Sequence, residues 1–206
     1  MVVDRIEKVR VFRASSKKEP TRRAALTPTL FTELRQPLGD YLAVPEVSSE
    51  ARVYLPLAFQ PGSVIANNKL YTVSDATIYH FGVLTSNIHM AWVRSVTGRL
   101  KSDYQYSTGI VYNNFPWPEN VTAEQTATIE RLAQAVLDAR LLFPTSTLAD
   151  LYDPNTMPPA LTKAHHDLDR AVDRLYRKEP FPSDLERVEL LFTEYQRLTE
   201  AGRRAD

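Results

Sequence analysis

The sequence predicts an α+β protein, in which a mixed β-sheet domain with a long packed helix is followed by a small all-α helical domain. Runs of β-branched and aromatic residues lie between turn residues before residue 75, which is typical of short strands. From Asp75 to Val96, and again after the Pro-Trp-Pro sequence at 116–118, apolar residues recur every three or four positions, which indicates helices. Seven of the ten tyrosines and both tryptophans precede residue 121, so the composition changes at the same place.

The composition excludes several classes of protein. With 206 residues, 43% of them apolar and 24% charged, the chain is neither collagen, nor a coiled-coil rod, nor disordered throughout. Cysteine is absent, which excludes disulfide scaffolds and Cys-ligated zinc. No apolar run approaches the roughly 18–20 residues of a membrane helix, and the start MVVDRIEKVR lacks the apolar core of a signal peptide. We therefore expect a cytoplasmic protein with no membrane partner.

Two segments near the N-terminus differ in composition from the strand-rich part that follows. Val3 to Phe12 alternates loosely between apolar and charged residues and fits either a strand or a short helix. Residues 14–24 are polar and basic, which favours a loop or an arm. The net charge is +4 over residues 1–120 and −4 over residues 121–206. This asymmetry is a mild electrostatic footprint, weaker than that of a strongly basic nucleic-acid module.

Three strands are predicted after residue 40, and turn residues separate them. Pro45 and Pro56 interrupt two of the runs, which suggests edge strands or bulges. The predicted strands are Tyr41–Val47, Val53–Phe59 and Val64–Val73.

One long helix is expected from Asp75 to about Val96, with Asp75 as its N-cap and Gly98 just after its end. Three further amphipathic helices follow residue 121. Their predicted starts are a capping box of Thr122 with Gln125, the pair Pro158-Pro159, and Ser183 with Glu186. Their apolar stripes include Leu141 in the first helix and Leu185 in the third.

Motifs for catalysis and for cofactors are missing from this sequence. The six glycines form neither a GxG turn nor a phosphate-binding loop, which argues against a complete nucleotide-dependent enzyme. His165 and His166 are adjacent on a helix, and His80 and His89 fall on opposite faces of the predicted long helix, so no pair suggests a metal site. We expect no catalytic, cofactor-binding or metal-ligating residue here. Asp167, Asp169 and Asp173 lie among arginines and fit a solvated helix face.

The sequence Asn113-Asn114-Phe115-Pro116-Trp117-Pro118 resembles the Asn-Pro-Pro-aromatic motif of amino-methylating DNA methyltransferases. In that motif the Asn side chain and a carbonyl bind the target amino group, and the aromatic ring stacks on the flipped base. Here the two consecutive prolines are missing. We therefore favour a structural junction, with Trp117 packed, over a catalytic role.

Polar side chains alternate with tyrosines between Gly98 and Ser107. In one extended strand, Lys101, Asp103 and Gln105 would share a face. Lysine donates to guanine O6 or N7, aspartate accepts from cytosine N4, and glutamine pairs with adenine. The alternative is an exposed strand with an internal Lys–Asp pair.

Several long blocks resemble the C-terminal part of MmeI-like DNA methyltransferases, which are large single-chain type II restriction–modification proteins. They cover nearly the whole chain, in order. The blocks are VPEVSSE (44–50), NKLYTVSDATIYHFGVLTSNIHMAWVR (68–94), GRLKSDYQYS (98–107), IVYNNFPWP (110–118), LADLYDP (148–154) and MPPALTKAHHDLDRAVDRLY (157–176).

The resemblance implies a target-recognition domain over residues 1–118, incomplete at its N-terminus, and a C-terminal helical domain over residues 121–206. Such a module would bind specific double-stranded DNA without altering it. The parent protein would be an S-adenosylmethionine-dependent, adenine-specific DNA methyltransferase of a bacterial defence system, with or without endonuclease activity. Its methyltransferase domain would be the module's partner in the same chain, and the cofactor would bind there rather than in this segment.

Site residues carried over by the resemblance fall into two groups. Lys101 and Asp103 would read one G·C pair, Asn68, Lys69 and Gln105 would read a neighbouring position, and Glu46 is a weaker candidate. Phosphate contacts, which position a protein without specifying sequence, would come from Ser48, Ser49, Arg52 and Arg99.

Two other functions remain open at this point. The three helices fit a protein-interaction scaffold that docks onto a methyltransferase domain without reading bases, and the acidic balance after residue 120 favours such protein contact. A stand-alone methyltransferase with an unusual cofactor site is the third possibility, although we expect no S-adenosylmethionine binding.

Overall fold

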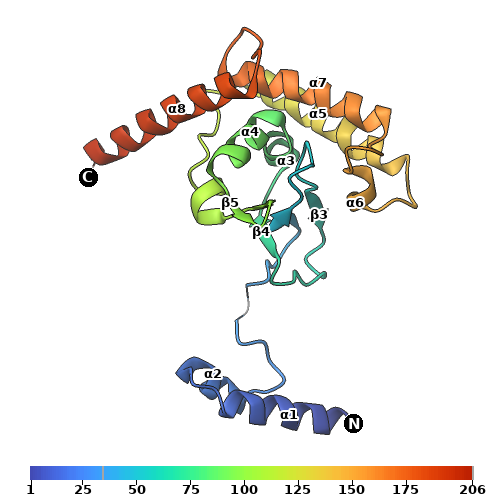
Figure 1. Cartoon of the computed structure of the whole chain (residues 1–206), viewed down its shortest axis with the longest axis vertical. Coiled ribbons are helices and arrows are strands. Elements are labelled where there is room, and N and C mark those ends of the chain that lie inside the picture. The colour runs from blue at the N-terminus through green and yellow to red at the C-terminus, as the bar shows by residue number, and fades with distance from the viewer. Residues whose placement is uncertain (34, 206) are drawn as a thin grey trace. The chain divides into compact units, whose positions relative to one another are not determined.

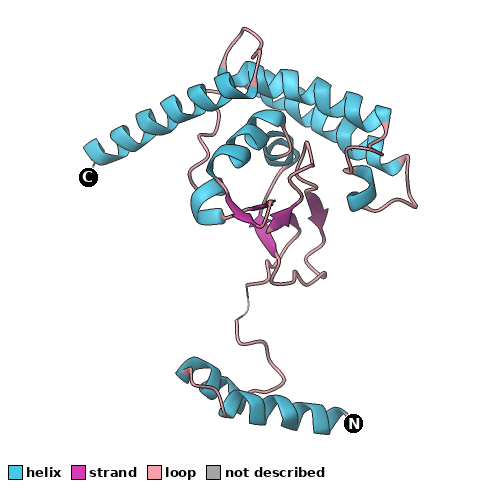
Figure 2. Cartoon of the chain, viewed as in Figure 1, coloured by secondary structure: helices cyan, strands magenta, loops and turns pink. Residues whose placement is uncertain are grey.

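The computed structural model describes residues 1–33 and 35–205, with side chains described as far as residue 200. Helices make up about 51% of the chain and strands about 11%, which confirms the α+β prediction. The chain divides into two compact units, Met1–Gln36 and Pro37–Asp206. Each unit is described by itself, and Figures 1 and 2 show the elements.

The first unit consists of short helices. Helix α1 (Val2–Ala14) settles the open choice for Val3–Phe12 in favour of a helix. The loop predicted at 14–24 is wrong in part, because α2 (Glu19–Arg23) lies within it. Its Pro20 occupies the first turn, where a missing N–H is harmless. The 3₁₀ helix η1 (Ala24–Leu26) follows, and the Arg13 guanidinium donates to the carbonyls of Ala24 and Thr27 at 3.0 and 2.9 Å.

Two small antiparallel sheets lie in the second unit (Figure 2). In the first sheet, β1 (Tyr41–Pro45) lies between β3 (Ala58–Gln60) and β4 (Leu70–Ser74). In the second sheet, β6 (Asp103–Gln105) lies between β2 (Val47–Ser48) and β5 (Gly98–Leu100). The chain passes directly from β1 to β2 through Glu46, so one continuous segment takes part in both sheets.

The predicted strands are longer than the observed ones. Of Val53–Phe59, only the last two residues are in a strand, and Val64–Val73 is a strand only from Leu70. Pro45, which was expected at an edge strand or a bulge, lies in the part of β1 that pairs with β4 alone, although β1 is central over Tyr41–Ala43. Its ring is tolerated because pairing with β3 has already ended at Ala43, so no partner strand requires a Pro45 N–H on that side.

The single helix predicted from Asp75 to Val96 is two helices, α3 (Ile78–Leu84) and α4 (Asn87–Val96). They are separated at Thr85–Ser86, where the Ser86 hydroxyl donates to the Val83 carbonyl at 2.7 Å and competes with the helical pattern. Asp75 is not the N-cap. Thr77 caps α3 in a capping box with His80. Helix α4 ends at Val96 as expected, with Thr97 as its C-cap, and Gly98 follows just after this end and also begins β5. Gly98 does not have the positive φ of a left-handed helix cap. Because the predicted helix is divided, His80 and His89 lie on different helices.

A π-helical turn, η2 (Thr108–Tyr112), precedes the C-terminal helices. These are α5 (Ala123–Leu141), α6 (Leu148–Leu151), α7 (Pro159–Tyr176) and α8 (Asp184–Ala205). The capping box of Thr122 with Gln125 is confirmed, whereas α6 was not foreseen. Leu141 and Leu185 were expected in the buried stripes, but they are 75% and 66% exposed.

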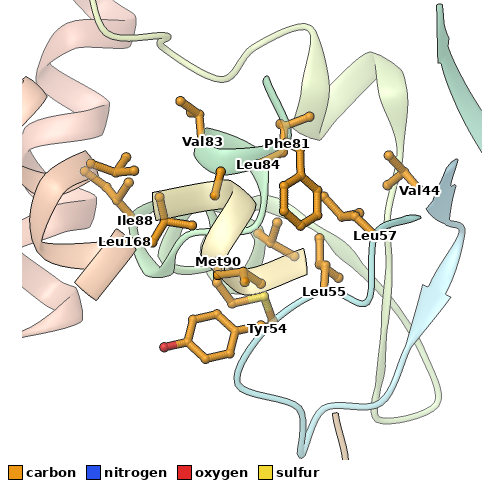
Figure 3. Close-up of a cluster of buried hydrophobic side chains, with 14 of the residues drawn as sticks. Val44, Tyr54, Leu55, Leu57, Phe81, Val83, Leu84, Ile88, Met90 and Leu168 are labelled. Carbon is orange, nitrogen blue, oxygen red and sulfur yellow. The ribbon is translucent and has the colours of Figure 1, made fainter. Parts of the chain in front are cut away.

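The core joins the sheets to the helices (Figure 3). Helix α3 packs against α5 through Gly82, where an added Cβ would lie 2.8 Å from Ile129 Cγ2 and 3.1 Å from Ala133 Cβ. Glycine therefore sets the close approach of these two helices.

A buried carboxylate ties the C-terminal helices to the sheet-bearing part. Asp169, which we expected on a solvated face together with Asp173, is only 7% exposed, and Asp173 is 8% exposed. The Tyr54 hydroxyl donates to Asp169 Oδ2 at 2.6 Å, and the Asn87 backbone N–H donates to Oδ1 at 2.7 Å. The Arg187 guanidinium donates to Asp173 Oδ2 at 2.7 Å. The partners of Asp169 lie 115 and 82 residues away in sequence. Together with Arg187 they compensate the two carboxylates for the loss of water.

Substituting Gly82 by alanine should destabilise the protein. The new methyl group would overpack the α3–α5 contact, which typically costs about 1–3 kcal/mol, while alanine regains about 1 kcal/mol of helix propensity. We expect overpacking to prevail, because the added Cβ would lie only 2.8 Å from Ile129 Cγ2, and the free energy of unfolding in urea to fall by up to about 2 kcal/mol. Gly98→Ala is the matched control, because nothing lies within 4 Å of its Cβ position. Equal stability of the two variants would contradict the assigned role of Gly82.

Asp169 should make the stability depend on pH. Burial raises the pKa of its carboxyl group from 3.8 to about 6. The native state therefore holds this proton more tightly than the unfolded chain, and the free energy of unfolding falls as the pH rises from about 4 through about 6. The size of this fall is roughly 2–3 kcal/mol.

In Asp169→Asn this contribution is removed, while an acceptor for the Asn87 N–H is kept. The stability difference, wild type minus variant, should decrease over that pH range in urea unfolding measured by circular dichroism. His89 and His165, whose pKa values burial lowers, titrate in both proteins and cancel in this difference. A difference that is constant between pH 4 and 7 would refute the assignment.

Candidate nucleic-acid interface

Strands β5 and β6 form a tight hairpin, and Lys101 and Ser102 are its turn. Leu100 pairs with Asp103 across the turn. Lys101 has a φ of 58°, the left-handed conformation that the first turn residue of such a hairpin adopts. The expected single strand carrying Lys101, Asp103 and Gln105 is therefore wrong. Lys101 lies at the tip, and only Asp103 and Gln105 share a strand face.

The outward face of β6 is fixed by the tyrosine between these two residues. Tyr104 is 5% exposed, and its hydroxyl donates to the Glu50 carbonyl at 3.3 Å. Because side chains alternate along a strand, Asp103 and Gln105 point the opposite way. Both are partly exposed, and Lys101 is exposed.

Tyr106, the residue after β6, anchors the same strand in the core. It is 2% exposed, and its hydroxyl lies 3.2 Å from His89 Nε2. Burial lowers the pKa of His89 to about 3, so the ring is neutral at physiological pH. No sequence pattern indicates this contact, because His89 and Tyr106 lie 17 residues apart in different elements.

The polar groups at the hairpin are largely available to a ligand. Asp103 Oδ1 accepts the Glu50 backbone N–H at 3.3 Å. In the part of the chain that the structure describes, three side-chain groups have no hydrogen-bond partner: Asp103 Oδ2, Lys101 Nζ and the side-chain amide of Gln105. One ammonium, one carboxylate and one amide are thus presented together.

Glu46 and Lys69 form a second group near this strand. Glu46 Oε2 lies 3.0 Å from Lys69 Nζ, and the Glu46 side chain is 18% exposed against 66% for Lys69. The Glu46 N–H donates to the Lys69 carbonyl at 3.0 Å, and its carbonyl accepts the Tyr106 N–H at 2.7 Å. Glu46 therefore links the two sheets and brings Lys69 close to the strand that carries Gln105.

Asn68 lies at an exposed turn beside this pair. Asn67 Oδ1 accepts the Lys69 N–H at 2.8 Å, which shapes the turn before β4. We call the set of Glu46, Asn68, Lys69, Lys101, Asp103 and Gln105 the candidate surface.

The four expected phosphate contacts differ in accessibility. Ser48 is 2% exposed, so its hydroxyl is not presented at the surface. Ser49 and Arg52 shape a turn, in which the Arg52 N–H donates to the Ser49 carbonyl at 3.1 Å. The Arg99 guanidinium lies over the Tyr104 ring, 4.1 Å from its centroid. Arg99 therefore belongs to the face opposite Asp103.

The sequence Asn113–Pro118 lies at the junction between the sheet-bearing part and the helices. Trp117 contacts Phe115 and His80 edge to face, with ring centroids 5.6 Å apart in both cases. The Tyr176 hydroxyl of α7 donates to the Pro116 carbonyl at 3.0 Å. These contacts support the structural role that we favoured for this segment.

The described residues offer neither a metal site nor a membrane-spanning helix. No group of three or more His, Asp or Glu side chains is placed to hold a metal ion among them. Nor does any helix of that part of the chain have the length and apolar character needed to cross a membrane.

Comparison with known proteins identifies relatives for almost the entire chain. Residues 1–119 match the family model of the MmeI target recognition domain, and residues 121–201 match that of the MmeI C-terminal domain. DNA methyltransferase A of Bacillus subtilis (strain 168) is 42% identical over 200 residues, which are 97% of this chain and 22% of that protein. The chain therefore spans about a fifth of the length of this relative.

A solved structure agrees closely. The type IIL restriction-modification enzyme MmeI, determined in complex with DNA, matches with a TM-score of 0.92 and 44% identity, over 97% of this chain and 26% of that one. Both family models, this relative and this structure lead to the same assignment, and the chain belongs to the MmeI family, matching its target recognition and C-terminal domains.

Proposed function

We propose that this chain reads base pairs in the major groove of double-stranded DNA through the candidate surface. The observation that carries this proposal is the β5–β6 hairpin, which presents the Lys101 ammonium at its tip and Asp103 Oδ2 beside it. The major groove, about 12 Å wide, admits a two-stranded β-ribbon. The DNA complex of the MmeI relative supports this function.

Each side chain has a chemically defined partner. The Lys101 ammonium donates to guanine O6 or N7, and the Asp103 carboxylate accepts from cytosine N4, so together they suit the two bases of one G·C pair. Gln105 follows Asp103 on the same strand face and fits an adenine in a neighbouring pair. Lys69 and Asn68 approach that neighbouring position from the turn before β4.

Contacts to the phosphates would come from exposed or partly exposed groups around the hairpin. We assign them to Ser49, Arg52 and Arg99. Arg99 is directed away from the base-reading face of β6 by its stacking on Tyr104, which suits a contact with the backbone at the groove edge. Buried Ser48 has no part in this proposal.

The larger protein is proposed by analogy with the relatives. We infer that residues 1–118 form the target-recognition domain and residues 121–206 the C-terminal helical domain of an adenine-specific DNA methyltransferase in a bacterial cytoplasm. S-adenosylmethionine and the chemical step would belong to a methyltransferase domain of the same protein. The names of the two relatives, a DNA methyltransferase and a restriction-modification enzyme, support this inference.

The helical part has a second candidate function as a docking scaffold for that methyltransferase domain. Residues 121–206 carry a net charge of −4, and DNA phosphates repel such a surface. Protein contact by the helices and base reading by the hairpin are compatible.

The first experiment selects binding sites for the full chain from a random duplex library. Replacing Lys101 and Asp103 by alanine together should relax the preference at one base pair, with a loss of roughly 1–3 kcal/mol of discrimination. The matched control is Lys163→Ala with Asp167→Ala, which likewise removes one lysine and one aspartate, 2.6 Å apart on α7, and should leave the site preference unchanged.

In fluorescence anisotropy measurements, log Kd should rise linearly with the logarithm of the salt concentration, because neutralised phosphates release counterions. An unaltered preference in the double variant would overturn the assignment of these two residues. Failure of the chain to bind any duplex at low salt would overturn the DNA-reading function.

A separate prediction concerns Glu46, which we assign as a positioning residue for Lys69. The Glu46→Gln substitution removes the charge that holds the Lys69 ammonium and keeps the side-chain shape. Site selection should show a relaxed preference at the base pair read by Lys69, and an unchanged preference at the pair read by Lys101 and Asp103.

A double-mutant cycle distinguishes positioning from direct reading by Glu46. If Glu46 acts through Lys69, then combining Glu46→Gln with Lys69→Ala adds nothing to Lys69→Ala alone. Additive effects would show instead that the carboxylate contacts DNA itself. Glu119→Gln, which breaks an exposed pair with Arg197, is the matched control.

A further inference from the structure

Strand β5 adds one aliphatic side chain to the base-reading face of the hairpin. Leu100 is directly opposite Asp103, and Gly98 is directly opposite Gln105. Residues opposite each other in an antiparallel pair lie on the same face, so Leu100 shares the face of Asp103 and Gln105. Gly98 has no side chain, and Arg99 lies on the other face with Tyr104. Leu100 is therefore the only side chain that β5 places on this face.

The position of Leu100 in the hairpin, more than its exposure, indicates a role in base reading. It is 51% exposed, and a single exposed leucine is ordinary on a protein surface. This one, however, lies next to the turn residue Lys101 and across from Asp103. Cβ atoms of such a cross-strand pair are about 4.5–5.5 Å apart, whereas successive bases along a DNA strand are separated by about 3.4 Å. A side chain opposite Asp103 therefore reaches the same base pair or the next one.

The chemistry of the groove then limits what Leu100 recognises. Leucine neither donates nor accepts hydrogen bonds, and the apolar group displayed in the major groove is the C5-methyl of thymine. We infer that Leu100 is a further specificity-determining residue, which packs against the methyl group of a thymine in the base pair next to the one that Asp103 reads. This inference rests on the proposed DNA-reading function and extends it to an apolar contact.

The test replaces each thymine of the selected binding site by uracil, one at a time, so that only the methyl group is lost. For the full wild-type chain, one of these replacements should weaken binding about fourfold, the effect of uncovering one methyl-sized group. Leu100→Ala should bind the thymine and uracil duplexes equally. Leu100→Met, which keeps an apolar side chain of similar volume, should retain the discrimination.

Leu185→Ala on α8 is the control, since it truncates a leucine that is similarly exposed, at 66%, on another surface. It should discriminate thymine from uracil as the wild type does. Circular dichroism of each variant verifies folding.

The inference is overturned if no thymine replacement affects the wild type, or if Leu100→Ala still discriminates. Neither result would affect the Lys101 and Asp103 assignment, which depends on which base pair changes in site selection. If the chain binds no duplex at all, it is the proposed function that fails.

Discussion

The burial of Tyr104 and Tyr106 is the constraint on which the candidate surface depends. Both rings lie in the core, at 5% and 2% exposure. They are two residues apart in an extended segment, so they point to the same face. The residues that alternate with them, Asp103 and Gln105, are therefore directed outward. A shift of β6 by one residue would bury a carboxylate and an amide and expose two aromatic rings, so the hydrophobic effect selects a single register.

The helices behind the hairpin stabilise this register without contributing to the candidate surface. Trp92 of α4 is 2% exposed, and its indole N–H donates to the Val111 carbonyl in η2 at 3.1 Å. Asp169 of α7 in turn holds both Tyr54 and the start of α4. The polar contacts within the core thus connect α7 to α4, which precedes the hairpin, and α4 to η2, which follows it, and a base-reading hairpin needs such rigid support.

Local signals predicted some of this structure correctly, and contacts between distant residues account for much of the rest. The capping box of Thr122 with Gln125 involves four consecutive residues, so the sequence alone reveals it. Asp169 has partners 82 and 115 residues away, and nothing around it in the sequence indicates that it is buried. The division between α3 and α4 was missed for a different reason. The apolar period continues past Thr85 and Ser86 and hides the local hydrogen bond from the Ser86 hydroxyl to the Val83 carbonyl.

In the hairpin, residue types alone identified the candidate segment but did not reveal its geometry. The polar residues between Gly98 and Ser107 were singled out from their types alone, and the turn at Lys101 was missed because lysine gives no signal of a positive φ. The turn changes the argument for base reading, because it moves Lys101 from the strand face to the tip and brings Leu100 opposite Asp103. Since these side chains contribute little to the core, the residue types that would read DNA can differ between proteins that share the same buried tyrosines.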